Sequence, residues 1–336
     1  MLTVVCEAPG RLEARERPAP ERGPDEILVR IRRVGVCGTD LHIFEGTQPY
    51  LSYPRVMGHE LAGIAEEVPE GSEVRVGDVV YIVPYLSCET CGACRSGRTN
   101  CCRHLQVLGV HRDGGMADYL SLPRRFVRAA TGLSLDQAAM VEFLAIGAHA
   151  VRRSRAVAGQ RCLVVGAGPI GIAVALFARL RGAAVTMLDA RRDRLAFCER
   201  ELDLRSVVEV GPGDEGELAA LTEGEMFDLV FDATGNPRAM ERGFRFVAHG
   251  GTYVLVSIVS GDISFSDPEF HKRETSLLGS RNATVEDFET VVEALRAGAI
   301  PADRLNTHRM PLADAPASFA RLLDPEQGVV KALLDV

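Results

Sequence analysis

The stretch VVGAGPIG, Val164 to Gly171, has glycines at positions 166, 168 and 171 in the spacing G-x-G-x-x-G. An apolar run typical of a strand precedes it, and an apolar run typical of a helix follows it. The first glycine permits a tight turn, the second lets the backbone approach a pyrophosphate, and the third allows close strand–helix packing. A helix N-terminus also offers free N–H groups to phosphates. The stretch therefore predicts a dinucleotide-binding turn.

Predicted strands and helices alternate around this turn. The strand-like runs are RCLVVGA, AAVTMLDA, SVVEV, FDLVFDATG and GTYVLVSIV, and the helix-like runs are PIGIAVALFARLRG, RRDRLAFCERELD and PRAMERGFRFVAHG. This alternation is typical of a doubly wound parallel sheet. We therefore expect a coenzyme domain over residues 151–278.

The second predicted strand of this domain ends in Asp189, eighteen residues after Gly171. A carboxylate there can accept hydrogen bonds from ribose hydroxyls and repels a 2′-phosphate, which favours NAD over NADP. Arg191, Arg192 and Arg194 follow closely and can hold a 2′-phosphate, so NADP stays open. The structural alternative is a plain glycine turn with Asp189 at the surface.

The first 130 residues are rich in Gly and Pro and contain the β-rich runs ILVRIRRVGV, LAGIAEEV and DVVYIVPYL, which predict a mostly antiparallel β domain. A helix is predicted over residues 135–153, with Ser134 as its N-cap. Another is predicted over residues 284–298. The remaining tail is too short to fold alone, so we expect it to return to the first domain, which then comprises residues 1–150 and 279–336.

The composition excludes some functions. The chain has 38 Lys and Arg against 46 Asp and Glu, a net charge of -8, which lacks the electrostatic footprint of a nucleic-acid binder. No secretory leader is visible, and the longest uncharged stretch, Cys162–Ala178, is interrupted by glycines and a proline. We expect a cytoplasmic protein with no membrane or nucleic-acid partner. Its nine cysteines then indicate thiols and metal ligands more than disulfides.

Two groups of residues carry metal-ligand chemistry. Cys88, Cys91, Cys94 and Cys102 follow the spacing C-x2-C-x2-C-x7-C, which suits a closed tetrahedral zinc site, with an iron–sulfur cluster as the alternative. Cys101 has no assigned role. The second group is dispersed over GVCGTDLH, GHE and VEFLAIGAHA. Its members have the ligand types of an open catalytic zinc site, although spacing does not show that they meet: Cys37, Thr39, Asp40, His42, His59, Glu60 and Glu142.

Over its full length the chain resembles the medium-chain zinc-dependent alcohol dehydrogenase family, on GVCGTDLH, MGHE, the four-cysteine lobe, VVGAGPIG and DATG. Within it, the chain is most similar to the polyol and sugar-acid branch of sorbitol, threonine and L-galactonate-type enzymes. The resemblance implies an α/β protein with a GroES-like, mostly β catalytic domain and a Rossmann coenzyme domain. It also implies one catalytic and one structural zinc per subunit and a homotetramer or homodimer, with GTYVLVSI as a candidate pairing edge.

The resemblance also assigns residues. Cys37, His59 and Glu142 become the catalytic zinc ligands, although the family's Glu-Pro pair is here Glu142-Phe143. Asp40 would orient a ligand. The catalytic candidates are Thr39, His42 and Glu60, of which Glu60 is a neighbouring or exchanging ligand. The cofactor-binding candidates are Gly166, Gly168, Pro169, Ile170, Gly171, Asp189, Arg194, Thr234, Ser257 and Ile258. The substrate-contact candidates are Tyr50, His111, Phe143 and Arg281, the last in the motif SRN.

The expected reaction is NAD-linked oxidation of a secondary alcohol of a polyol or sugar acid to the ketone. Zinc would lower the pKa of the substrate oxygen, and the proton would leave through Thr39, the cofactor ribose and His42. One alternative is an NADP-linked reductase of the same fold acting on a different carbonyl or alcohol. A zinc-independent quinone reductase would lack both cysteine-containing sites. A non-catalytic zinc-ribbon module binding nucleic acid would need a basic face.

Overall fold

The computed structural model describes residues 1–49 and 51–336, so Tyr50, an expected substrate contact, lies outside the described residues. The chain divides into two units, Met1–Phe143 with Thr284–Val336, and Leu144–Ala283. The expected limits at 150/151 and 278/279 fall inside helix α4 (Val141–Ser154) and strand β16 (Ser276–Gly279), because changes in sequence pattern do not mark the ends of elements. Among the described residues, no helix is long and apolar enough to cross a membrane.

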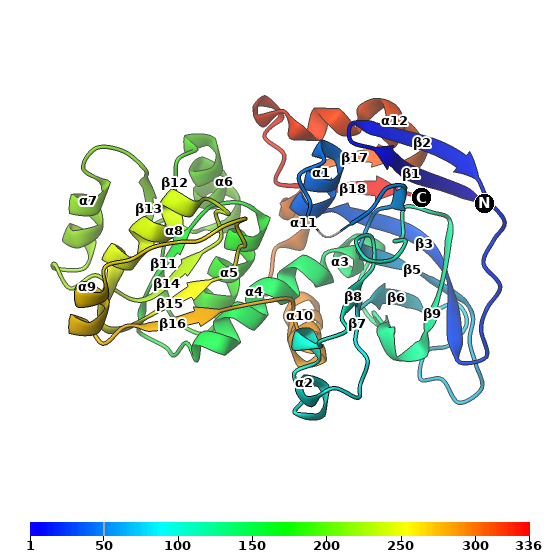
Figure 1. Cartoon of the computed structure of the whole chain (residues 1–336), viewed down its shortest axis with the longest axis horizontal. Helices are drawn as coiled ribbons and strands as arrows, with labels where there is room; N and C mark the ends of the chain where they lie inside the picture. Colours follow the sequence, from blue (N-terminus) through cyan, green and yellow to red (C-terminus); the bar gives the residue numbers. More distant parts are fainter. Residues whose placement is uncertain (50) are drawn as a thin grey trace. The chain divides into compact units, whose positions relative to one another are not determined.

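The first unit contains both chain ends and is mostly β (Figure 1). Its strands are β1 Leu2–Ala8, β2 Arg11–Glu16, β3 Glu26–Val36, β4 Arg55–Val56, β5 Glu60–Glu67, β6 Val79–Ile82, β7 Tyr85–Leu86, β8 Gln106–Val107, β9 Tyr119–Pro123, β10 Val127–Ala129, β17 Asn306–Pro311 and β18 Lys331–Asp335. Its further helices are α1 Gly38–Glu45, α2 Gly92–Arg95, α3 Leu135–Ala139, α10 Val285–Arg296, α11 Ala302–Leu305 and α12 Ala315–Ser318.

The main sheet of this unit has the order β10-β6-β5-β3-β18-β17, with β9 also paired to β3. Its pairings are antiparallel except for β17 with β18. The central strand β3 buries Ile27, Val29 and Ile31 by simple alternation, and an irregularity after Ile31 then shifts its register against β5. That shift helps to bury the strand's C-terminal end as well. The last strand, β18, pairs with this end of β3, so the chain returns to the sheet in which it began.

The second unit contains a parallel sheet (Figure 1). Its strands are β11 Arg161–Val165, β12 Ala184–Asp189, β13 Val207–Glu209, β14 Phe227–Asp232, β15 Val247–Leu255 and β16. Its helices are α5 Pro169–Leu180, α6 Arg192–Leu202, α7 Asp214–Leu221, α8 Pro237–Gly243 and α9 Asp267–Lys272. All pairings are parallel, in the order β13-β12-β11-β14-β15-β16, which confirms the predicted doubly wound sheet.

Two local predictions need correction. The run GTYVLVSI was predicted as a pairing edge, but β15 lies between β14 and β16, because the short strand β16 adds outside it. The helix predicted over residues 135–153 is two helices that meet at Met140. Ser134 does cap the first, since its hydroxyl accepts a hydrogen bond from the backbone N–H of Gln137 at 3.2 Å. The break places Glu142 in the first turn of α4.

Candidate active site and metal centres

Three of the dispersed residues meet in the first unit. The ligand atoms of Cys37, His59 and Glu60 all lie within 4.8 Å of one another. Cys37 follows β3 and is the N-cap of α1, whereas His59 directly precedes β5 and Glu60 is its first residue. Because β3 and β5 are antiparallel neighbours, with Gly35 opposite Glu60, the end of one strand lies beside the start of the other. Sheet pairing therefore assembles the cluster.

Asp40 joins the two segments that carry Cys37 and His59. Its carboxylate accepts a hydrogen bond from the backbone N–H of Cys37 at 2.9 Å and another from that of Gly58 at 3.1 Å. Burial raises the pKa of Asp40, and the attraction of His59 partly offsets that rise. Asp40 Oδ1 also lies 3.9 Å from Nδ1 of His59. The carboxylate therefore lies beside the imidazole, as expected for a residue that orients a zinc ligand, although 3.9 Å is too long for a hydrogen bond.

Glu142 lies close to this cluster without belonging to its tight core. It is buried in the first turn of α4, and its Oε1 accepts a hydrogen bond from the hydroxyl of Tyr85 at the start of β7. Burial raises the pKa of Glu142, while attraction to His59 and the Tyr85 hydroxyl oppose that rise. Among the described residues, the group of donor atoms that lie within 4.8 Å of one another includes an oxygen of Glu60 and none of Glu142. Two buried carboxylates therefore stand near one thiol and one imidazole.

Glu60 has a partner that sequence reasoning missed. Both of its carboxylate oxygens accept hydrogen bonds from the ammonium of Lys331, at 2.7 and 2.8 Å. Lys331 begins β18, and both side chains are buried. A single Lys in the run VVKALLDV carries no local signal of such a pairing, because the pair exists only through the sheet.

The donor set of this cluster fits zinc. A thiol, an imidazole and a carboxylate are the ligands of open zinc sites, and all three donors are within reach of one ion. Nδ1 of His59 is buried without a hydrogen-bond partner. Burial alone would lower the pKa of His59, but Asp40, Cys37 and Glu142 outweigh it and raise the pKa well above its usual value. The environment is thus built for a cation.

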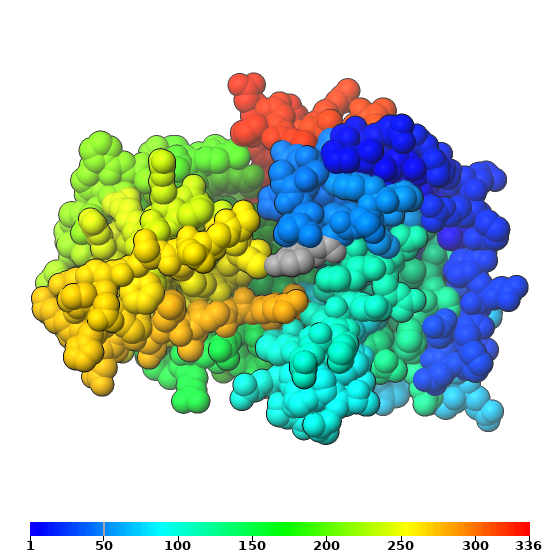
Figure 2. All heavy atoms as spheres, in the orientation of Figure 1, coloured from blue at the N-terminus to red at the C-terminus, as the bar shows by residue number. Residues whose placement is uncertain are grey.

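The four-cysteine lobe is a second, closed cluster. Single sulfur atoms of Cys88, Cys91, Cys94 and Cys102 lie within 4.8 Å of one another, and all nine cysteines of the chain are free thiols. Hydrogen bonds to the sulfur of Cys88, chiefly from Thr90, lower its pKa to about 5, which favours the thiolate that binds metal. The lobe forms a bulge on the surface of its unit (Figures 1 and 2, cyan). Cys101 is exposed and outside the group.

The glycine turn in the second unit has the expected geometry. Gly166 has φ +102°, a conformation that L side chains rarely adopt. A side chain at Gly171 would overlap the carbonyl oxygen of Gly166. The carboxylate of Asp189, at the end of β12, accepts hydrogen bonds from the backbone N–H of Ala167 at 2.6 Å and of Arg191 at 2.7 Å. Asp189 therefore lies against the turn that would hold a pyrophosphate.

The ends of β14 and β15 form a polar group around Asp232. The hydroxyls of Thr234 and Ser257 donate to its carboxylate at 2.9 and 3.0 Å, and Ser257 accepts from the backbone N–H of Gly235 at 2.9 Å. Parallel strands end here on one edge of the sheet, where such folds bind ligands. Thr234 and Ser257 were predicted from the sequence to bind the cofactor, whereas Asp232 was not, although it begins the motif DATG. Ile258, just beyond, is 75% exposed.

Known proteins match both units. Residues 23–131 match the alcohol dehydrogenase GroES-like domain and residues 169–297 match the zinc-binding dehydrogenase domain. The L-galactonate-5-dehydrogenase of Escherichia coli K12 is 41% identical over 335 residues, which cover 99% of this chain and 98% of that protein. The chain belongs to the zinc-dependent medium-chain alcohol dehydrogenase family. It lies within the polyol dehydrogenase branch, as predicted.

Solved structures agree on the cofactor class of this dehydrogenase. The rspB alcohol dehydrogenase of E. coli CFT073, complexed with NADH, has a TM-score of 0.93 at 28% identity and covers 100% of this chain and 99% of its own. A zinc-binding dehydrogenase of Sinorhizobium meliloti 1021 bound to NADP has a TM-score of 0.91 at 29% identity, with the same coverage. The enzyme is therefore an oxidoreductase that uses zinc and a nicotinamide cofactor.

The remaining predicted residues of the dehydrogenase are placed as follows. Thr39 is half-buried and His42 exposed on α1, whereas Arg194 is half-buried on α6 and Arg281 is exposed after β16. His111 lines a cavity of 420 Å³ in the first unit, together with Arg55 and His104. Phe143 was expected to contact substrate, but it is only 1% exposed and its ring lies against the ammonium of Lys331. The structure therefore assigns it a packing contact instead.

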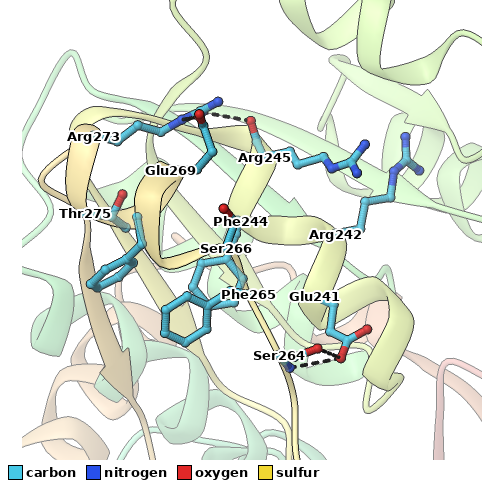
Figure 3. Close-up of a pocket in the computed structure, with 11 residues that line it drawn as sticks. Glu241, Arg242, Phe244, Arg245, Ser264, Phe265, Ser266, Glu269, Arg273 and Thr275 are labelled. Atoms are coloured by element: carbon cyan, nitrogen blue, oxygen red, sulfur yellow. Dashed lines mark hydrogen bonds and ion pairs between the residues drawn. The ribbon is translucent and has the colours of Figure 1, made fainter.

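A larger cavity, of 610 Å³, lies in the second unit around α8 and α9 (Figure 3). Its aromatic wall includes Phe244 and Phe265, whose ring centroids are 4.6 Å apart. Its three arginines already face carboxylates, as Arg242 with Asp214, Arg245 with Glu215 at 3.9 Å and Arg273 with Glu269 at 3.5 Å. None of the predicted site residues that the structure describes lines it. Cavity size alone therefore does not locate the chemistry of this dehydrogenase.

Proposed function

We propose that this dehydrogenase oxidises a secondary alcohol of a sugar acid, an aldonate, to the ketone, using NAD and a zinc ion held by Cys37, His59 and Glu142. The observation that carries the proposal is the cluster in which the thiol of Cys37 and the imidazole of His59 meet the carboxylate of Glu60, with the carboxylate of Glu142 buried nearby. The relative at 41% identity is named L-galactonate-5-dehydrogenase, which supports a sugar acid. A neutral polyol is the second candidate.

A zinc ion at this site would supply the Lewis acid that lowers the pKa of the alcohol, and NAD would supply the acceptor for the hydride. The chain supplies the remaining steps. Thr39, two residues after Cys37, receives the hydroxyl proton and passes it towards His42, whose exposure connects it to solvent. Asp40 holds the segments of Cys37 and His59 together. Asp189 accepts hydrogen bonds from the ribose of NAD.

The cavity around His111 supports an anionic substrate. Arg55 contacts Asp113 at 3.1 Å, but Arg17 also faces Asp113 at 3.5 Å, so two guanidinium groups share one carboxylate and leave a net positive charge. Arg55 precedes His59 by four residues, so the chain between them spans at most about 14 Å. Among the lining residues that the structure describes, none is an Asp or Glu. We infer that Arg55, with His104 and His111, binds the carboxylate of the substrate.

Initial rates of NADH formation with hexonates and the matching alditols test this proposal. We expect a higher kcat/KM for a hexonate. Arg55→Met should raise KM for the hexonate about tenfold and leave KM for an alditol unchanged, since one charged contact is lost. Arg17→Met is the matched control, because it also removes a partner of Asp113 but does not line the cavity. Equal loss with hexonate and alditol would reject the subsite.

We further propose two zinc ions per subunit, one in each cluster, and a cytoplasmic homodimer or homotetramer. The four free sulfur atoms within 4.8 Å support the second ion. Metal analysis of the purified chain should give two zinc ions and no iron. Light scattering should give a particle larger than one chain, and the mass of a single chain would reject the oligomer.

A further inference from the structure

The start of α6 carries three arginines and one carboxylate, directly after the strand that ends in Asp189. Arg191 is the N-cap of α6, and Arg192, Asp193 and Arg194 follow in its first turn. Arginines at this place can hold the 2′-phosphate of NADP, which is why the sequence alone leaves the cofactor open. The preference between NAD and NADP therefore depends on what these guanidinium groups contact.

Arg191 is held by Asp193 through two hydrogen bonds. Its Nε donates to Oδ1 of Asp193 at 3.1 Å, and its Nη2 donates to Oδ2 at 2.6 Å. The guanidinium thus meets the carboxylate with two nitrogens, which is also the geometry in which an arginine grips a phosphate. These bonds lower the pKa of Asp193, so its carboxylate is charged at neutral pH. Arg191 is therefore already engaged by an anion of the chain itself.

The backbone of Arg191 places this pair beside the carboxylate expected to bind ribose. Its N–H donates to Oδ1 of Asp189 at 2.7 Å. Arg194 belongs to the same group of charges, because burial and the repulsion of Arg191 lower its pKa while attraction to Asp193 and Asp189 opposes that change. Two arginines and two carboxylates thus stand together, and their formal charges cancel. Each oxygen of Asp189 can accept a second hydrogen bond, so a ribose hydroxyl still finds an acceptor.

A 2′-phosphate would enter this group at a disadvantage. It carries a charge of about −2 at neutral pH and would lie against Asp189 in place of a hydroxyl. Arg191 could compensate only by leaving Asp193, whose carboxylate would then stand unpaired beside the phosphate. NAD has a hydroxyl at this position and requires no guanidinium. The local balance of charge therefore favours NAD.

Arg192, the third arginine, contacts a different carboxylate. Its Nη2 lies 3.7 Å from Oε2 of Glu199, seven residues further along α6. The side chain of Arg192 is 61% exposed, whereas that of Arg191 is 35% exposed. Arg191 is therefore the arginine that a 2′-phosphate at the ribose carboxylate would engage first.

We propose that Asp193 is a second determinant of the preference for NAD, because it holds Arg191 away from the 2′-phosphate of NADP. The proposal rests on the proposed function, in which Asp189 is the ribose-binding carboxylate. Asp189 acts on the ribose directly, whereas Asp193 acts through Arg191 and is a positioning residue. The side chain of Asp193 is 54% exposed, and partly exposed ion pairs are weak, so a single substitution opens this pair without disturbing the fold.

Asp193→Asn tests this role, because it removes the charge and keeps the shape of the side chain. The probes are adenosine 2′,5′-bisphosphate and AMP, which differ only in the 2′-phosphate and need neither zinc nor hydride transfer. Titration calorimetry should show an affinity for the bisphosphate that rises about tenfold, since Arg191 becomes able to bind the phosphate. The affinity for AMP should stay within about twofold, as for most surface substitutions. An unchanged ratio of the two affinities would overturn the proposal.

Asp203→Asn is the matched control at the other end of α6. Asp203 is the C-cap of this helix and contacts Arg205 at 2.5 Å, so the pair has the same residue types and the same spacing of two. This variant loses the same charge but lies away from Asp189 in the sequence, and it should leave the ratio of the two affinities unchanged. An equal rise in both variants would reflect net charge alone and would overturn the role of Asp193.

The double variant Asp193→Asn with Arg191→Met separates the guanidinium from the carboxylate. The gain in affinity for the bisphosphate should disappear, because the group that binds the phosphate is gone. A gain that persists would show that Arg191 does not carry it and would overturn the proposal. A wild-type protein that binds AMP but oxidises neither hexonates nor alditols with NAD would instead overturn the proposed function, since the two probes report on the ribose subsite without any reaction.

Discussion

The four-cysteine lobe takes its proposed ligands from fifteen consecutive residues, Cys88 to Cys102, whereas the proposed catalytic cluster takes Cys37, His59 and Glu142 from three distant places in the chain. The lobe is a surface bulge with four sulfur donors. The catalytic cluster is largely buried and mixes sulfur, nitrogen and oxygen donors. Asp40 accepts a hydrogen bond from the backbone of Cys37, Tyr85 contacts Glu142, and Lys331 pairs with Glu60 beside them. A closed all-thiolate site holds structure together, and an open mixed site can bind a substrate.

The difference shows where the fold contributes to the chemistry. A short looped segment can close around an ion by itself, so the lobe needs little from the rest of the chain. The catalytic cluster needs β3, β5 and β18 in register and α4 broken from α3 at Met140. Substitutions at the two clusters should therefore differ in their effects on activity and stability.

The largest effect is expected for Cys37→Ala. Loss of the thiolate should remove one of the two zinc ions and lower kcat/KM about a thousandfold or more, since the metal polarises the reacting alcohol. The lobe should keep its ion, so metal analysis should give one zinc per chain. Retention of both ions by this variant would refute the assignment of Cys37.

Cys94→Ser should affect stability more than catalysis. The lobe should lose its zinc, and the Tm should fall by roughly 10 °C, because a structural zinc site contributes folding free energy. Well below the Tm, kcat of the folded protein should stay within about threefold of wild type. Calorimetry and rate measurements on one sample check both parts. A kcat as low as that of Cys37→Ala would contradict the proposed difference between a structural and a catalytic cluster.

Asp189→Ala should leave both metal clusters intact and change only cofactor use. The KM for NAD should rise about tenfold, and the preference for NAD over NADP should shrink, because a hydrogen-bonded charge beside the ribose is lost. Steady-state kinetics with both cofactors provides the measurement. An NAD to NADP ratio equal to that of wild type would count against the ribose role.

The smallest effect is expected for His42→Gln. Because His42 is exposed on α1, water and added bases can replace it in part, so kcat should fall only about fivefold, below the roughly 100-fold or more that a positioned proton-transfer group usually contributes. Added imidazole should restore part of the rate in this variant and none in Cys37→Ala. Lack of imidazole rescue would argue against a proton relay through His42.

Local sequence patterns predicted much of the fold, but they did not predict the contacts that sheet pairing creates between distant residues. The glycine turn and the four-cysteine lobe each lie within one continuous stretch of sequence, so the spacing of their residues was enough to locate them. The alternation of predicted strands and helices indicated the parallel sheet. The pairing of Lys331 with Glu60 joins residues 271 positions apart, and no local pattern contains it. Phe143 was expected to contact substrate, but its ring is buried and lies against the ammonium of Lys331, a contact that no local pattern predicts. Strand β16 was not predicted from the sequence.

The central claim is that substrate binds at the dispersed cluster and not at the lobe. It is tested most directly by the visible spectra of the cobalt-substituted wild-type, Cys37→Ala and Cys94→Ser proteins before and after addition of a hexonate. A spectral change is expected in the wild type and in Cys94→Ser, and none in Cys37→Ala. A change that persists in Cys37→Ala and disappears in Cys94→Ser would contradict it.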